Sequence, residues 1–170
     1  EHDELAQAVL ISKDEALLQR VIELIEMRLP GMVREEIIRR SIGDRGALIL
    51  AQDDDEIAAI VNKIAPEHLE LALRDADEFL PRIQHAGAIF IGNHSAEVVG
   101  DYSAGPSHVL PTSGTARFAS ALGVYDFQVR SSVIRCSAAG AVSLSRDAAI
   151  LAAEEGLEAH ARSAEFRVRG

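Results

Sequence analysis

The sequence predicts an α/β fold in which a parallel sheet is flanked by helices and a helical tail arm ends the chain. Short apolar segments alternate with segments of helical periodicity along the first half of the sequence. Each short segment is apolar on both faces, as in parallel strands that helices cover on either side. A long helical segment near the C-terminus accounts for the arm.

The first strand is expected at residues 6–12 (AQAVLIS), and a helix is expected between it and Pro30. Ser12 and Glu15 have the spacing of a capping box, in which a hydroxyl and a carboxylate satisfy backbone N–H groups where a helix starts. Apolar residues then recur at helical spacing at Leu17, Val21, Leu24 and Ile25. The helix is expected to end before the proline, which cannot continue it.

The same alternation continues up to the segment AGAIFIG. The expected elements are a helix at 34–42, a strand at 46–52, a helix at 53–65, a helix at 74–83 and a strand at 86–92. The helix at 53–65 opens on acidic residues, which the helix dipole favours in a first turn. A short apolar stretch, LELAL, follows Pro66. This order of elements is typical of a parallel sheet covered by helices.

The sequence changes character after the last of these strands. Residues 93–115 hold several glycines and prolines without a sustained period, and so long a connection in a compact domain is more often functional than idle. Residues 118–137 are expected to contribute a short helix and one or two strands. A helix at 145–166, with Ser145 as its N-cap, is expected to end the fold.

Composition and charge exclude several classes of protein. The 170 residues are 48% hydrophobic and 26% charged, which is ordinary for a globular domain. A net charge of −10 without a basic cluster argues against nucleic-acid and anionic-lipid partners. No apolar run is long enough to span a membrane, and no secretory signal is visible. The single cysteine, Cys136, excludes an internal disulfide and a cysteine-based zinc cluster, so a cytoplasmic location is expected.

Common catalytic motifs are absent from the sequence. There is no GxGxxG or Walker A loop to cradle a phosphate. The segment GPSHV resembles a nucleophile elbow, but Val109 stands where that motif needs glycine. Glu67 and His68 do not belong to HExxH, and Ile64 occupies the first histidine position of the inverted zinc motif.

Six histidines are the main candidates for proton or metal chemistry in this acidic chain: His2, His68, His85, His94, His108 and His160. His85 and His94 flank a strand end and are read as ordinary surface residues. His160 lies at the edge of the apolar stripe of the last helix, where an interface residue is more common than a ligand. Asp101 and His108 bracket the glycine-rich loop, although a loop aspartate is as often a turn cap.

The neighbours Glu67 and His68 follow a proline at the end of a predicted helix. Adjacent residues on a regular element point apart, so both face one site only where the backbone is irregular. Pro66 supplies that irregularity, because it biases Ala65 out of the α region and can start a new turn. The residues therefore permit an acid and an imidazole in one pocket but do not require them there.

Three segments together resemble the C-terminal portion of histidinol dehydrogenase, the zinc enzyme that finishes histidine biosynthesis. They are IAPEHLE, GDYSAGPSHVLPTSGTARFASALGVYDFQ and EEGLEAH, and the likeness extends over essentially all 170 residues. This length is less than half of the family's usual chain. Because the chain opens at Glu1 without methionine, and a family glutamine ligand would stand just before it, part of the native chain is expected to be missing.

The resemblance also implies a division of the chain. Residues 1–122 would be the second half of an incomplete Rossmann-like catalytic domain. Residues 123–147 would form a short linking segment, and residues 148–170 a tail helix for dimer contact. In this family the tail reaches across to the neighbouring subunit, so a homodimer with tail exchange is expected.

The implied cofactors are Zn2+ and NAD. Carried over by resemblance, the zinc ligands are His2, Asp101 and His160, and two imidazoles with one carboxylate suit Zn2+. The zinc would mainly orient the substrate. No residue of the chain is assigned to NAD.

The implied reaction is a two-step oxidation of L-histidinol, through the aldehyde, to L-histidine. By resemblance, His68 removes the alcohol proton as hydride leaves, and Glu67 activates water for attack on the aldehyde-level intermediate. The residues expected to bind substrate are His68, Asp101, His108, Glu155 and His160.

The leading interpretation is a catalytic segment of the enzyme that is inactive alone and binds zinc weakly. Two other functional classes compete with it. A non-catalytic dimerisation or metal-binding module is disfavoured because it would not need all of Glu67, His68, Asp101, His108 and Glu155. A zinc hydrolase is disfavoured because no water-activating motif with tight ligand spacing is present.

Overall fold

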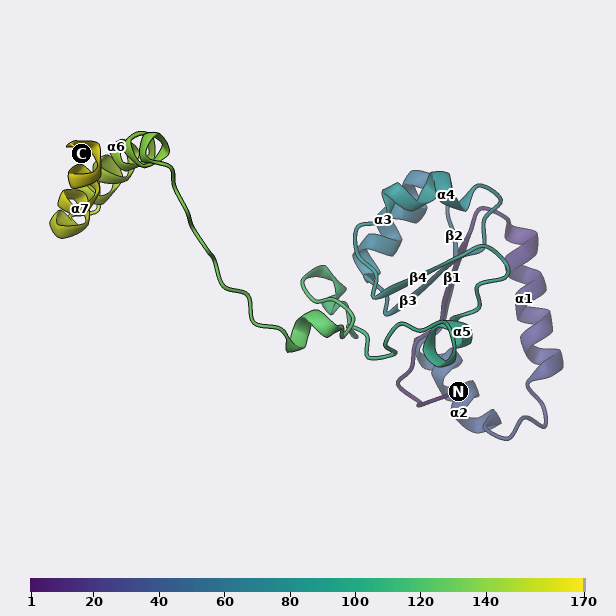
Figure 1. Ribbon diagram of the computed structural model, residues 1–170. Coiled ribbons are helices and arrows are strands. Elements are labelled where there is room, and N and C mark those ends of the chain that lie inside the picture. Colours follow the sequence, from purple (N-terminus) through teal and green to yellow (C-terminus); the bar gives the residue numbers. More distant parts are fainter. Residues whose placement is uncertain (170) are drawn as a thin grey trace. The chain divides into compact units, whose positions relative to one another are not determined.

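The computed structural model describes residues 1–169 and divides the chain into two compact units, Glu1–Phe127 and Gln128–Gly170 (Figure 1). The first unit is a mixed α/β body, and the second is a pair of helices. The observed boundary falls inside the segment expected to link the domains. Among the described residues, no helix is long and apolar enough to cross a membrane.

The first unit contains short parallel strands flanked by helices, as predicted. Its elements are β1 (Val9–Ser12), α1 (Glu15–Arg28), α2 (Glu35–Arg45), β2 (Ala47–Leu50), α3 (Asp54–Ile64), β3 (His68–Leu71), α4 (Ala76–Phe79), β4 (Ala88–Ile91) and α5 (Glu97–Tyr102). Three 3-10 turns, η1 (Leu80–Arg82), η2 (Thr115–Arg117) and η3 (Val124–Phe127), complete it. Strand β1 pairs in parallel with β2, and β3 pairs in parallel with β4. The strands lie between α1 on one side and α3 and α4 on the other (Figure 1).

Helix α1 ends before Pro30 as predicted, but the predicted capping box at its start is wrong. The N-cap is Asp14, whose carboxylate accepts a hydrogen bond from the backbone N–H of Leu17 at 3.1 Å. Ser12 still belongs to β1, and its hydroxyl accepts from the N–H of Asp14 at 3.0 Å. The extended strand therefore holds Ser12 too early in the chain to cap the helix.

Helix α3 ends where the sequence predicts a break. Ala65, its C-cap, has no exposed surface and adopts a left-handed conformation, with φ 49° and ψ 64°. It thus leaves the right-handed α region, as expected for a residue before proline. The chain then becomes extended, and the apolar stretch after Pro66 forms β3. The helix expected at 74–83 is reduced to the single turn of α4 followed by η1.

The core of the first unit covers one face of the β3–β4 pair. Buried apolar side chains of α3, β3 and α4 form it, with one residue that follows β2: Ala51, Ile57, Ala58, Val61, Leu71, Ala76 and Phe79. Side chains alternate along a strand, so Leu71 points to the core while His68 and Glu70 point to the opposite, second face of the pair. The register pairs Glu70 with Phe90 and thereby places Phe90 on that second face. This core does not cover the second face of the β3–β4 pair.

The second unit contains two helices where the sequence predicts one helix at 145–166. Helix α6 spans Ala138–Glu154 and α7 spans Glu158–Arg169, with the left-handed Gly156 (φ 74°) between them. The N-cap is Ser137, not Ser145, which lies buried within α6. The helix thus begins inside the expected linking segment. No described residue of the range 118–137 forms a strand, because none of its apolar residues has a hydrogen-bonded neighbouring strand.

Candidate active site

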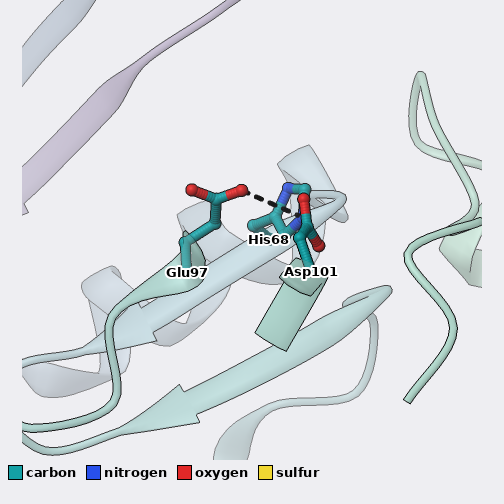
Figure 2. Close-up of side chains that lie close together, drawn as sticks. All are labelled: His68, Glu97 and Asp101. Atoms are coloured by element: carbon teal, nitrogen blue, oxygen red, sulfur yellow. Dashed lines mark hydrogen bonds and ion pairs between the residues drawn. The ribbon is translucent and has the colours of Figure 1, made fainter. Parts of the chain in front are cut away.

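Three side chains from two elements meet on the second face of the β3–β4 pair (Figure 2). His68 is the first residue of β3, and Glu97 and Asp101 stand four positions apart on α5, which places them on the same side of that helix. The His68 Nε2 atom lies 3.2 Å from Asp101 Oδ1 and 3.6 Å from Glu97 Oε1. One ligand atom from each residue lies within 4.8 Å of the others.

Helix α5 is held against this face by a strand residue. The Glu70 carboxylate accepts a hydrogen bond from the backbone N–H of Glu97 at 3.0 Å, which anchors the first turn of the helix. The Phe90 ring lies beside His68, with 6.0 Å between the ring centroids and a tilt of 34°. Contacts to both strands therefore determine where the two carboxylates of α5 meet the imidazole.

The cluster is partly shielded from water, and its two carboxyls differ in acidity. The exposed fractions are 24% for the His68 side chain, 19% for Asp101 and 39% for Glu97. Burial raises the pKa of Glu97, and Asp101 raises it further, against the opposing charges of His68 and His2. The hydrogen bond with His68 lowers the pKa of Asp101. A proton is therefore held more firmly on Glu97, and Asp101 is the more readily ionised partner of His68.

The cluster suits a cation. One imidazole and two carboxylates offer the nitrogen and oxygen donors that Zn2+ and related divalent ions bind, and two carboxylates also favour an ammonium group. The expected ligand Asp101 belongs to it. His68, expected as a proton acceptor, and Glu97, which sequence reasoning missed, complete the group.

The other residues expected in the first unit have different positions. His2 lies close enough to Glu97 for its charge to oppose the rise in the pKa of that carboxyl. His108 lies close enough to Asp101 to contribute to the lowering of the pKa of Asp101. Glu67 lies at the bend before β3, where its backbone carbonyl accepts from the N–H of Ala88 at 2.8 Å. Its carboxylate is not a member of the cluster formed by the described residues.

Two expected site residues belong to the second unit. Glu155 is the C-cap of α6 and His160 lies on α7, and both are exposed. The zinc set of His2, Asp101 and His160 includes residues of both units and stays a prediction.

Glu97 was missed because the helix that carries it was not predicted. Residues 93–115 read as an irregular loop, yet EVVGDY within them forms α5. The available signal was the four-residue spacing of Glu97 and Asp101, which matters only once a helix is assumed.

Parallel strands flanked by helices, with an imidazole and two carboxylates gathered at the start of β3, define an α/β protein with a candidate cation site. The histidinol dehydrogenase family model matches residues 1–168. A histidinol dehydrogenase from Pseudomonas aeruginosa is 60% identical over 168 residues, and one from Dechloromonas aromatica is 59% identical. These alignments cover 99% of this chain. The chain therefore belongs to the histidinol dehydrogenase family.

Other relatives agree with this assignment. A Thiocapsa roseopersicina histidinol dehydrogenase is 59% identical, with 98% of this chain and 72% of the relative aligned. The crystal structure of histidinol dehydrogenase from Elizabethkingia anophelis has a TM-score of 0.90 and 28% identity, covering 99% of this chain and 39% of that one. The chain spans 38% and 39% of the length of the Pseudomonas aeruginosa and Dechloromonas aromatica relatives. Its expected place at the C-terminal end of the longer chains stays a prediction.

Proposed function

We propose that the chain carries the proton-handling and metal-binding part of a histidinol dehydrogenase. The complete enzyme would oxidise L-histidinol with NAD, through the aldehyde, to L-histidine. Family membership supports the reaction class. The single observation that carries the assignment is the contact between His68 Nε2 and Asp101 Oδ1 at 3.2 Å, because it fixes an imidazole beside a carboxylate.

His68 is the proposed proton acceptor in the alcohol step. A histidine suits this role because its ordinary pKa lies near neutral pH. An ionised Asp101 accepts a hydrogen bond only from a protonated ring nitrogen, so with the proton on Nε2 the basic nitrogen is Nδ1. Asp101 thus orients the ring and supports the imidazolium that forms when the alcohol proton is taken up.

Glu67 is the proposed base that activates water in the aldehyde step. It directly precedes His68 at an irregular point of the backbone, which supports a shared site. The bend after Pro66 frees Glu67 from the strict alternation of a strand.

The proposed cofactors are NAD and Zn2+. Asp101, one of the proposed metal ligands, belongs to a cluster whose imidazole and carboxylate groups are donors of the kinds that Zn2+ binds. When bound, the metal would orient the amine and imidazole of the substrate. Among the residues of this chain, His2, Asp101 and His160 would hold the metal, and His108 and Glu155 would contact substrate. Glu97 adds a carboxylate that would steady a cationic group beside His68.

The proposed assembly is a cytoplasmic homodimer in which the helices of the second unit cover a neighbouring subunit. Large apolar side chains on and between these helices are exposed, which supports a partner surface. They are Leu144, Ile150, Leu151, Leu157 and Phe166. The 170-residue chain by itself is expected to be inactive and to bind zinc weakly.

The test uses the full natural polypeptide that carries these residues, with turnover followed as NADH formation from histidinol and, separately, from the aldehyde. His68→Asn should lower kcat about 100-fold or more on histidinol, as expected for loss of a general base. Glu67→Gln should impair the aldehyde step more than the alcohol step. His94→Asn, at an exposed histidine outside the cluster, should match the unmodified protein.

Equal losses in both steps would overturn the role of Glu67. Full activity of the isolated 170-residue chain would overturn the expectation that it is inactive alone. Zinc binding without turnover by the full natural polypeptide would instead favour a non-catalytic metal-binding or dimerisation module.

A further inference from the structure

The Phe90 ring supports both halves of the site. It lies on β4, on the face that the register shares with His68 and Glu70. One contact of the ring is with the His68 imidazole, at 6.0 Å between centroids. Another is with Gly100 in the middle of α5, the residue before Asp101. The same aromatic ring therefore touches the imidazole and the helix that carries its carboxylate partners.

Gly100 has no room for a side chain at this contact. A Cβ atom built on it would lie 2.4 Å from Cε1 and 2.7 Å from Cζ of Phe90. Glycine inside a helix costs about 1 kcal/mol relative to alanine, so local helix propensity does not favour it here. The close approach of α5 to the aromatic ring explains why glycine fits the position.

The helix has little freedom to adjust elsewhere. Its first turn is fixed by the hydrogen bond from the Glu97 N–H to Glu70, and Asp101 faces His68. A change in the spacing between Phe90 and Gly100 must therefore either move α5 against one of these contacts or shift the Phe90 ring and its contact with His68.

We propose that Phe90 is a positioning residue for the reaction, which sets the distance between His68 and the two carboxylates of α5. This inference deepens the proposed function and rests on it for its kinetic consequence. The ring limits how closely α5 approaches the strands, and it contacts the His68 imidazole. Phe90 acts through His68 and does not contact the reacting atoms.

The experiment is a double-mutant cycle in the full natural polypeptide. Gly100→Ala forces a displacement of about 1 Å to restore ordinary contact with the ring, and a misplacement of that size can cost about 100-fold in rate. Phe90→Leu removes the outer ring atoms and should lower kcat about 10-fold, because His68 loses its support. In the Phe90→Leu background, Gly100→Ala should have little further effect.

Gly43→Ala is the matched control, because Gly43 also lies inside a helix and a Cβ there meets nothing within 4 Å. It should leave kcat unchanged. Crystal structures of the variants give a second readout, in which Gly100→Ala should lengthen the 3.2 Å contact between His68 and Asp101. The double variant should restore it.

Multiplicative rate losses in the double variant, or a Gly100→Ala structure with the His68–Asp101 distance unchanged, would overturn the positioning role. If the unmodified polypeptide does not oxidise histidinol, the proposed function fails. In that case the distances in the variant structures still decide whether Phe90 sets the geometry of the cluster.

Discussion

Gly87 is the position where the smallest addition should most disturb the proposed base Glu67. A Cβ atom on Gly87 would lie 2.6 Å from the carbonyl oxygen of Glu67 and 3.1 Å from Cδ of Pro111. The oxygen belongs to the backbone and already accepts a hydrogen bond from the N–H of Ala88. No side chain can rotate out of the way, so Gly87→Ala must displace the backbone of Glu67.

The size of this displacement follows from the contact. Restoring the ordinary 3.4 Å separation requires Glu67 and Gly87 to move apart by about 0.8 Å. Overpacking of this kind costs about 1–3 kcal/mol of stability. Alanine also restricts the unfolded chain more than glycine does, which stabilises the folded protein by only about 0.4–1 kcal/mol. A net destabilisation of about 1–2 kcal/mol is therefore expected, with a rate loss approaching 100-fold if Glu67 serves the reaction.

Urea unfolding followed by circular dichroism measures the stability of Gly87→Ala, and steady-state turnover by the full natural polypeptide measures its activity. Gly43→Ala again serves as the control, because it makes the same chemical change at an open helical position. The control should be neutral or more stable by up to about 1 kcal/mol. If both variants behave alike, the contact between Gly87 and Glu67 does not constrain the site.

Two further predictions concern acidity and packing. Glu97→Gln should raise the thermal midpoint of unfolding at neutral pH, because burial and Asp101 disfavour the ionised Glu97 carboxylate and raise its pKa. This gain in thermal midpoint should fade as the pH falls toward 4.5, where the carboxyl becomes protonated in both the folded and the unfolded chain. A gain that does not depend on pH would contradict this cause. Phe79→Ala should destabilise the first unit by about 3–5 kcal/mol in urea unfolding, since its side chain is only 5% exposed. The exposed Phe118→Ala should change stability by less than about 0.5 kcal/mol, and equal effects of the two would refute the assignment of the core.

Local sequence patterns were sufficient for most elements of the first unit. Helical spacing predicted α1, α2 and α3, and the apolar segments predicted β1, β2 and β4. Pro66 correctly predicted the break after α3. The errors occurred where a residue has several possible roles: Ser12 and Ser145 both fit an N-cap by type, but one remains in a strand and the other is buried within a helix.

The sequence by itself determined an alternation of strands and helices, and a break in the backbone just before Glu67 and His68. These features depend on spacing within a few residues and on the fixed geometry of proline. Only the tertiary structure decided which groups surround His68. Asp101 is 33 positions away in the chain, and Glu97 reaches the imidazole because Glu70 and Phe90 hold an unpredicted short helix against the strands. Such partners are selected by packing between distant segments, which no local pattern records.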